Sequence, residues 1–231
     1  MSGASVSEWR PVPPGSRVDV DVHVLHYSGP RRWADQALES LRDEPCRIWL
    51  VEGGFPDSIG AARAFALTLG AGEYCSFIDD DDYVVPGAMQ ACIDYLGAHP
   101  ECVGVYTDLE HLHANGQRDR ELKGPWRPLR QLTYCPEVTH LKVMRRSAVE
   151  PFLDDLARWP TYEEYVLCAL MVELGEWAHL PIVGAVKRFK PASRSSMRLA
   201  TPALWRQAVA RVTPALMAAH RRQDLMPDAG V

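Results

Sequence analysis

The stretch Phe77-Ile78-Asp79-Asp80-Asp81-Asp82-Tyr83 places four carboxylates directly after an apolar segment. The apolar segment from Tyr74 to Ile78 is short and rich in residues that favour β-structure. This pattern predicts a buried strand that ends where the acids begin. Ligands of open α/β sheets bind at the carboxyl ends of the strands. The acidic run is therefore expected at the ligand-binding edge of a sheet.

The spacing of the four acids indicates how they share that edge. Side chains alternate along a strand, so Asp79 and Asp81 are expected on one side and Asp80 and Asp82 on the other. Carboxylates that converge on one point suit a hard divalent cation such as Mg or Mn, which prefers oxygen ligands and bridges protein to phosphate. A solvated acidic turn is the alternative. The strand before the run and a helix predicted at 86–96 favour the metal site.

The composition is that of an ordinary globular protein. The chain has 231 residues and a formal net charge of −5, so no overall attraction draws it to nucleic acid. No apolar stretch approaches the length that spans a bilayer, and residues 1–17 are polar and Pro-rich without an apolar signal core, which predicts a cytoplasmic protein. The six cysteines form no CxxC pair and are expected to be small buried hydrophobes rather than zinc ligands or disulfides.

Strand and helix patterns alternate over the first half of the chain. Strands are expected at 18–25, 46–51, 74–78 and 103–106, and helices at 32–41, 59–69 and 86–96. Ser58 is the expected N-cap of the second helix. This alternation predicts an α/β fold with a Rossmann-like, mostly parallel central sheet flanked by helices.

The second half of the chain is less regular. Asn115-Gly116 predicts the turn of a hairpin within 111–130, and Ser147 is the expected cap of a helix after a strand at 138–144. Further helices are expected at 162–174 and 202–222, and an extended segment at 179–186. The chain is thus divided into a flexible arm (1–17), a main domain (18–200) and a C-terminal basic helix and tail (201–231).

Several motifs resemble those of a known family in the order in which they occur. They are His26-Tyr27-Ser28, Val51-Glu52-Gly53-Gly54, Ala62-Arg63-Ala64, Asp79 to Asp82, Glu163-Glu164-Tyr165 and Lys187-Arg188-Phe189. Over about Val18 to Arg194, the chain resembles the inverting glycosyltransferases of family 2, which have the GT-A fold of the nucleotide-diphospho-sugar transferase superfamily. The acidic run resembles the family's DxD motif in its DxDD form, and Glu163-Glu164 resembles the acidic motif that supplies the catalytic base. Glu52 and Glu164 stand where the family usually has aspartate.

The resemblance implies a metal-dependent enzyme that moves a sugar from a nucleotide diphosphate, most often a UDP-sugar, to an acceptor hydroxyl. It implies a nucleotide-sugar-binding half at 18–108 and an acceptor-binding half at 109–200. The implied donor-binding residues are His26, Tyr27, Ser28, Glu52, Arg63, Asp79, Asp80, Lys187, Arg188 and Arg194. The implied ligands of Mn or Mg are Asp81, Asp79 and Asp82.

The catalytic role falls on Glu164, with Glu163 beside it. As the general base, Glu164 is expected to contribute about 10²- to 10⁴-fold to the rate. Acids also favour the first turn of a helix through its dipole, so a structural role is the alternative for both. His140 is open between a hydrogen-bonded structural histidine and an acceptor contact, and Asp108 between a turn residue and a cleft residue.

A basic segment follows the last motif. From Lys187 to Arg222 the chain carries nine lysine and arginine side chains and no acid. Such a strip binds leaving-group phosphate, an anionic membrane surface or a nucleic-acid backbone, unless it is only the solvated face of a helix. The acceptor is accordingly open between a glycan and a hydroxylated base in DNA.

Two other functions remain open from the sequence. A nucleotidyltransferase shares the Rossmann-like half and a metal, and Ser28-Gly29-Pro30-Arg31-Arg32 is a poor candidate for its phosphate loop. A non-catalytic module would bind a nucleotide or nucleic acid without turnover, with an affinity that falls as salt rises.

Overall fold

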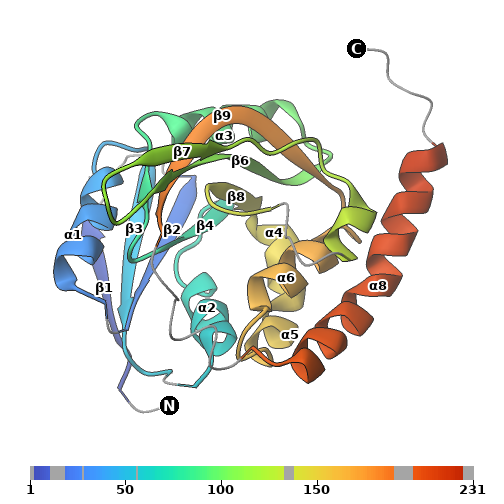
Figure 1. Cartoon of the computed structure of the whole chain (residues 1–231), viewed down its shortest axis with the longest axis horizontal. Coiled ribbons are helices and arrows are strands. Elements are labelled where there is room, and N and C mark those ends of the chain that lie inside the picture. The colour runs from blue at the N-terminus through green and yellow to red at the C-terminus, as the bar shows by residue number, and fades with distance from the viewer. Residues whose placement is uncertain are drawn as a thin grey trace.

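One mixed sheet organises the residues that the structure describes, which are 3–10, 19–27, 29–55, 57–132, 138–189 and 200–225 (Figure 1). The strands of this computed structural model are β1 (Ser5–Arg10), β2 (Val20–His26), β3 (Cys46–Glu52), β4 (Tyr74–Asp79), β5 (Tyr83–Val84), β6 (Cys102–Leu112), β7 (Arg118–Glu121), β8 (Lys142–Arg145) and β9 (Glu176–Arg188). Their order in the nine-stranded sheet is β1-β3-β2-β4-β8-β6-β9-β5, and β7 pairs with β6.

The first part of the sheet has the expected parallel arrangement. β3, β2 and β4 are parallel neighbours, connected through α1 (Arg31–Ser40) and α2 (Ile59–Leu67). Ser58 caps α2 as expected, because its side chain accepts a hydrogen bond of 3.1 Å from the N–H of Ala61. The carboxyl ends of these strands therefore lie together, and the acidic run lies among them.

The expectation of a mostly parallel sheet is wrong for the second part. β8 lies between β4 and β6 and is antiparallel to both, whereas β6 and β9 are parallel. β6 and β7 form the expected hairpin, with Gly116 in the turn at a φ of 84°. The described part of the chain between β7 and β8 includes no helix apart from the short 3-10 segment Pro128–Leu132, and antiparallel pairing needs no long crossover.

The interpretation of residues 1–17 as a flexible arm is wrong over Ser5–Arg10. These residues form β1, which pairs antiparallel with β3 at one end of the sheet. Trp9 packs partly buried against the core on the α1 side. The strand pairs with backbone groups of β3 that would otherwise form an open sheet edge. The hydrophobic periodicity of six mostly polar residues does not predict such a strand, because its stability comes from pairing with β3.

Helices cover both faces of the sheet (Figure 1). One core cluster packs α1 and α3 (Ala88–Ala98) against β2, β3 and β4, and a second packs helices on the opposite face. The latter are α2, α4 (Arg146–Val149), α5 (Leu153–Ala157), α6 (Glu163–Met171) and α8 (Pro202–Leu225), with the 3-10 segments η1 (Pro128–Leu132) and η2 (Glu150–Phe152). A small third cluster, Leu25, Val51, Ala62 and Ala66, packs α2 against the ends of β2 and β3. Ala208, Val212 and Leu216 of α8 are buried in the same core as α6, so the described C-terminal helix is part of the main domain.

The start of α4 differs from the expected one. Ser147 is not a cap, because α4 begins at Arg146 directly after β8 and its N-cap is Arg145. No helix in the described ranges is both long and apolar enough to cross a bilayer.

Candidate active site

The acidic run turns away from the sheet after its first member. β4 ends at Asp79, and the N–H of Asp82 donates a 3.1 Å hydrogen bond to the carbonyl of Asp79, which closes a turn. The strand alternation assumed for Asp80, Asp81 and Asp82 is therefore wrong. The structure instead groups Asp79 and Asp82 with His140, and their ligand-type atoms all lie within 4.8 Å of one another.

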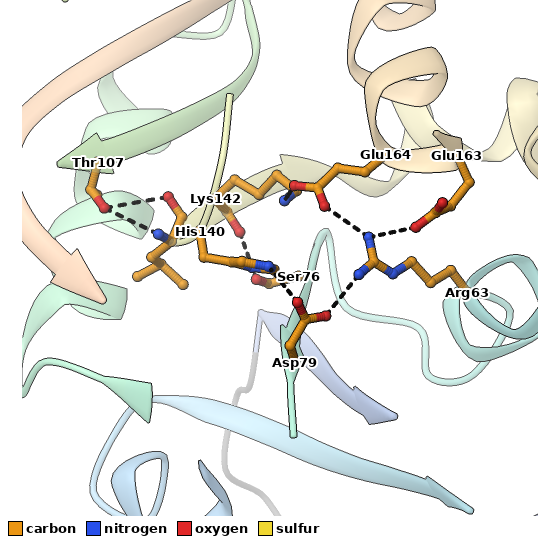
Figure 2. A network of polar contacts seen from close by, with 9 residues as sticks. Arg63, Ser76, Asp79, Thr107, His140, Lys142, Glu163 and Glu164 are labelled. Carbon is orange, nitrogen blue, oxygen red and sulfur yellow. Dashed lines mark hydrogen bonds and ion pairs between the residues drawn. The ribbon is translucent and has the colours of Figure 1, made fainter. Parts of the chain in front are cut away.

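His140 reaches Asp79 through the pairing of β8 with β4. The two strands are antiparallel with Cys75 opposite Met144. His140 lies two residues before β8, and its Nε2 atom lies 3.3 Å from Asp79 Oδ2 at the end of β4. The ring of Phe77 meets His140 edge-on at 5.9 Å between centroids. Figure 2 shows Asp79 and His140, whose side chains point toward each other.

Asp82 offers a buried oxygen to this group. Its Oδ1 accepts a 3.0 Å hydrogen bond from the N–H of Arg188, whereas its buried Oδ2 has no hydrogen-bond partner among the described residues. Burial, with the carboxylates of Asp79 and Asp81, holds the pKa of Asp82 well above its ordinary value. A buried carboxylate oxygen without a partner, beside a second carboxylate and an imidazole, fits a divalent cation.

Arg63 on α2 joins the acidic run to the second acidic motif. Its guanidinium lies 2.7 Å from Asp79, 3.0 Å from Glu163 and 2.9 Å from Glu164 (Figure 2). Burial alone would lower the pKa of Arg63, but these three carboxylates raise it. The guanidinium also lies 4.2 Å from the ring centroid of Phe77, in a cation–π contact. Four charged side chains from three elements therefore form one ion-paired unit around the buried guanidinium.

Lys142 on β8 is the second cation of this unit. Its side chain is fully buried, its Nζ binds the Oε1 of Glu164, and it lies 4.2 Å from the ring centroid of Phe77. Burial would raise the pKa of Glu164, but Lys142, His140 and Arg63 hold it below its ordinary value. Glu164 is consequently ionised at neutral pH.

The two acids at the start of α6 differ in access. The Glu163 side chain is 7% exposed and the Glu164 side chain 23%. Burial raises the pKa of Glu163, against the effect of Arg63. Tyr162, the N-cap, has a φ of 63°, a strained conformation for an aromatic residue at the point where the chain turns into α6. Of the predicted catalytic pair, Glu164 is the more exposed.

The donor-binding residues predicted on the first two strands lie at the same edge as the acids. His26 and Glu52 are register partners at the ends of β2 and β3. His26 Nδ1 is 2.6 Å from Asp80 Oδ2, and Glu52 Oε1 accepts a 2.7 Å hydrogen bond from Arg31. Burial raises the pKa of Asp80, against the effect of His26. Asp80 therefore faces β2, away from the Asp79, Asp82 and His140 group.

The remaining donor-binding residues have different surroundings. Tyr27 is 38% exposed, and burial of its hydroxyl raises its pKa to about 12. Burial would lower the pKa of Lys187, but the charges of Asp79, Asp82, Glu164 and Asp81 raise it. Ser28 and Arg194 lie outside the described residues.

Arg188 contacts the acidic run through its backbone rather than its charge. The N–H of Arg188 binds Asp82, whereas its guanidinium binds Gln36 and lies 5.6 Å from the ring centroids of both Trp33 and Tyr83. The predicted contact of this side chain with a diphosphate thus requires it to leave the aromatic pair.

Sequence reasoning did not assign two central residues of this site. The sequence leaves His140 open between a structural role and an acceptor contact, and no motif includes Lys142. Both interrupt the apolar segment 138–144, and they are two positions apart, so they share one side of an extended chain. A charged residue in an otherwise apolar strand pattern was the available signal.

Asp108 and two arginines of the basic segment have hydrogen-bond or ion-pair partners within the protein. Asp108 lies within β6 rather than in a turn, and it binds the N–H of Lys123 (2.7 Å) and His179 Nε2 (2.8 Å). In the basic segment, Arg211 pairs with Asp155 on α5, and Arg222 donates to the carbonyl of Val172. Part of the predicted basic strip is therefore used within the domain.

The described residues have a glycosyltransferase fold, with acids, a histidine and buried cations gathered at the carboxyl edge of its parallel strands. Among solved structures the chain is similar to TarS from S. aureus, residues 1–349, with a TM-score of 0.56 and 14% identity over 92% of this chain and 76% of that one. The similarity extends to TarS in complex with UDP (TM-score 0.58, 13% identity) and with UDP-GlcNAc (TM-score 0.57, 14% identity). At such identities, the likeness establishes the fold.

The similarity of the sequence to known proteins is limited. No family model matches the chain. The uncharacterized protein y4gI of Sinorhizobium fredii is 26% identical over 142 residues, which are 59% of this chain and 15% of that protein. The chain thus spans a small part of this relative's length.

Proposed function

We propose that this chain is a glycosyltransferase of the family 2 type, which transfers a sugar from a UDP-sugar to an acceptor hydroxyl with inversion at the anomeric carbon. The observation that carries the proposal is the single guanidinium of Arg63, which lies 2.7 Å from Asp79 and 2.9 Å from Glu164. It brings the two acidic motifs into one site. The fold shared with TarS, solved with UDP and UDP-GlcNAc, supports the class of donor.

The proposed cation site consists of Asp79, Asp82 and His140, with Asp81 of the same turn as the further predicted ligand. An imidazole among carboxylates favours Mn over Mg, which prefers oxygen ligands only. When bound, the cation neutralises charge that develops on the diphosphate leaving group. Lys187, whose pKa the charges of the same acids raise, adds a second positive charge for the departing phosphate. His26, Tyr27, Glu52 and Asp80 border the nucleoside side of this edge.

Glu164 is the proposed general base. Lys142 and Arg63 keep it ionised, and its partial exposure lets it accept the proton of an acceptor hydroxyl. Glu163 is buried against Arg63, so in this proposal it positions the guanidinium rather than touching the substrate. The carboxylate of Asp79 has both of its oxygens in polar contact, one with Arg63 and one with His140.

The test is to incubate the chain with UDP-sugars and Mn and to identify the products. Release of UDP, with transfer to an acceptor or to water, is expected. Glu164→Gln is expected to lower the rate by about 10²- to 10⁴-fold while UDP binding is kept. Glu173→Gln, an exposed acid shortly after α6, is the matched control and is expected to keep full activity.

The alternatives give different products. A nucleotidyltransferase releases pyrophosphate from a nucleoside triphosphate, and a non-catalytic module binds UDP without turnover. Full activity of Glu164→Gln would remove the base assignment. The cytoplasmic location and the acceptor class, glycan or modified DNA base, stay predictions from the sequence.

A further inference from the structure

A polar and aromatic surface continues along the sheet from the acids. It consists of His111 and His113 at the end of β6, Asp119 and Glu121 on β7, and Phe189 after β9; we call it the hairpin face. His111 is the register partner of Lys187 on β9, and the N–H of Phe189 donates to the carbonyl of Leu112. Residues two apart on a strand share a side, so the hairpin face lies on the same side of the sheet as Lys187.

The rings of this face are fixed in place and yet accessible. Phe189 is 56% exposed, and its ring centroid lies 6.0 Å from that of His111 and 5.2 Å from that of His113. His111 is 3.3 Å from Asp119 and 3.1 Å from Glu121, and His113 is 2.8 Å from Asp119. Such contacts restrict the rotamers of these side chains before a ligand binds, so that binding costs less conformational entropy.

We propose that the hairpin face binds a neutral saccharide, as the part of the acceptor next to the sugar unit that is glycosylated. The inference rests on the proposed function and names its acceptor class. A sugar ring has an apolar C–H face that packs on an aromatic ring, and hydroxyls that bond to imidazole and carboxylate groups. Phe189 is two residues beyond Lys187, about 6.6 Å along the strand, so the hairpin face begins close to the proposed site of transfer.

Charge separates this acceptor from DNA. The Asp119 side chain is 59% exposed and that of Glu121 is 36% exposed, so both acids face solvent on this surface. Lys123, which binds Glu121, is only 7% exposed and does not present its charge outward. A phosphate backbone on the hairpin face would meet two carboxylates, whereas a neutral glycan would meet hydrogen-bond acceptors.

The test measures binding directly, apart from catalysis. Saturation-transfer NMR is recorded with chitobiose, cellobiose, lactose and maltose at millimolar concentration, on the full chain with UDP and Mn, and a short single-stranded DNA is the other arm. At least one disaccharide is expected to bind wild type. Phe189→Ala and His113→Ala are expected to weaken that binding by about three- to tenfold, the value of one aromatic contact. Leu122→Ala removes an exposed apolar side chain outside the hairpin face and is expected to leave it unchanged.

The outcomes are separable from those of the proposed function. Binding of no disaccharide by wild type, equal binding by Phe189→Ala, or binding of DNA that Phe189→Ala weakens would each overturn the saccharide site. UDP binding and UDP-sugar hydrolysis are measured on the same samples. A chain that binds and hydrolyses the donor but no saccharide keeps the proposed function and loses only this inference. A chain that binds the saccharide but no donor loses the proposed function, and with it the acceptor role of the hairpin face, which is then a saccharide-binding site only.

Discussion

Arg63 Nη1 lies 2.9 Å from Glu164 Oε2, although 101 positions separate the two residues in the chain. The contact joins α2 to the first turn of α6, and the same guanidinium binds Asp79 at the end of β4. A buried charge is stable only when it is paired. The network proposed to support catalysis is thus also one that holds the helices of this face on the sheet.

Arg63→Met is expected to destabilise the fold by about 3–5 kcal/mol, because it leaves Asp79, Glu163 and Glu164 without their shared cation. Urea unfolding followed by tryptophan fluorescence measures the change. Arg31→Met removes an exposed arginine that also pairs with two carboxylates, and is expected to change stability by less than about 1 kcal/mol. Equal effects of the two substitutions would show that the Arg63 network does not stabilise the fold.

Mn is expected to stabilise the wild-type chain, by about 2.7 kcal/mol when its concentration is 100 times its dissociation constant. Asp79→Asn and Asp82→Asn are expected to abolish the shift in melting temperature, because each removes a charged ligand atom of the proposed site. Asp94→Asn, an exposed acid on α3, is the control. A shift that survives in Asp82→Asn but is lost in Asp81→Asn would favour the ligand pairing derived from strand alternation over the group with His140.

Lys142→Met is expected to move the acid limb of the pH–activity profile upward. Lys142 is among the groups that hold the pKa of Glu164 below its ordinary value, so removal of the ammonium raises that pKa. A general base must be deprotonated, so the acid limb, which in wild type lies below the ordinary pKa of a glutamate, is displaced to a higher pH in the variant. Far-UV circular dichroism at each pH is the folding control. A parallel loss of rate at every pH, with no displaced limb, would contradict the link between Lys142 and Glu164.

Removal of residues 1–10 is expected to lower the melting temperature by at least about 2–4 °C, corresponding to about 1 kcal/mol or more. The truncation takes away β1 and the partly buried Trp9, and it exposes the edge of β3. Hydrogen exchange of the β3 amides is the second measurement and should accelerate. A truncated chain with unchanged stability and exchange would restore the flexible-arm interpretation.

Local patterns predicted several elements well. The acids at the end of β4, the capping by Ser58 and the turn at Gly116 each depend on neighbours within a few residues, and each was found as expected. Failures occurred where a distant partner decides the outcome. Ser5–Arg10 is a strand because β3 is beside it, and Asp82 meets Asp79 because the strand ends early and a turn folds back. No periodicity in one sequence contains that information.

The residues alone determined that a parallel α/β sheet would present acids at its carboxyl edge, because burial periodicity and turn chemistry act over short spans of chain. Only the tertiary structure decided which groups meet those acids. The pairing of β8 with β4 brings the preceding residue His140 to within 3.3 Å of Asp79, and the packing of α2 against α6 brings Arg63 to Glu164. Such pairings follow from strand order and helix packing, which depend on the free energy of the whole core rather than on any local segment.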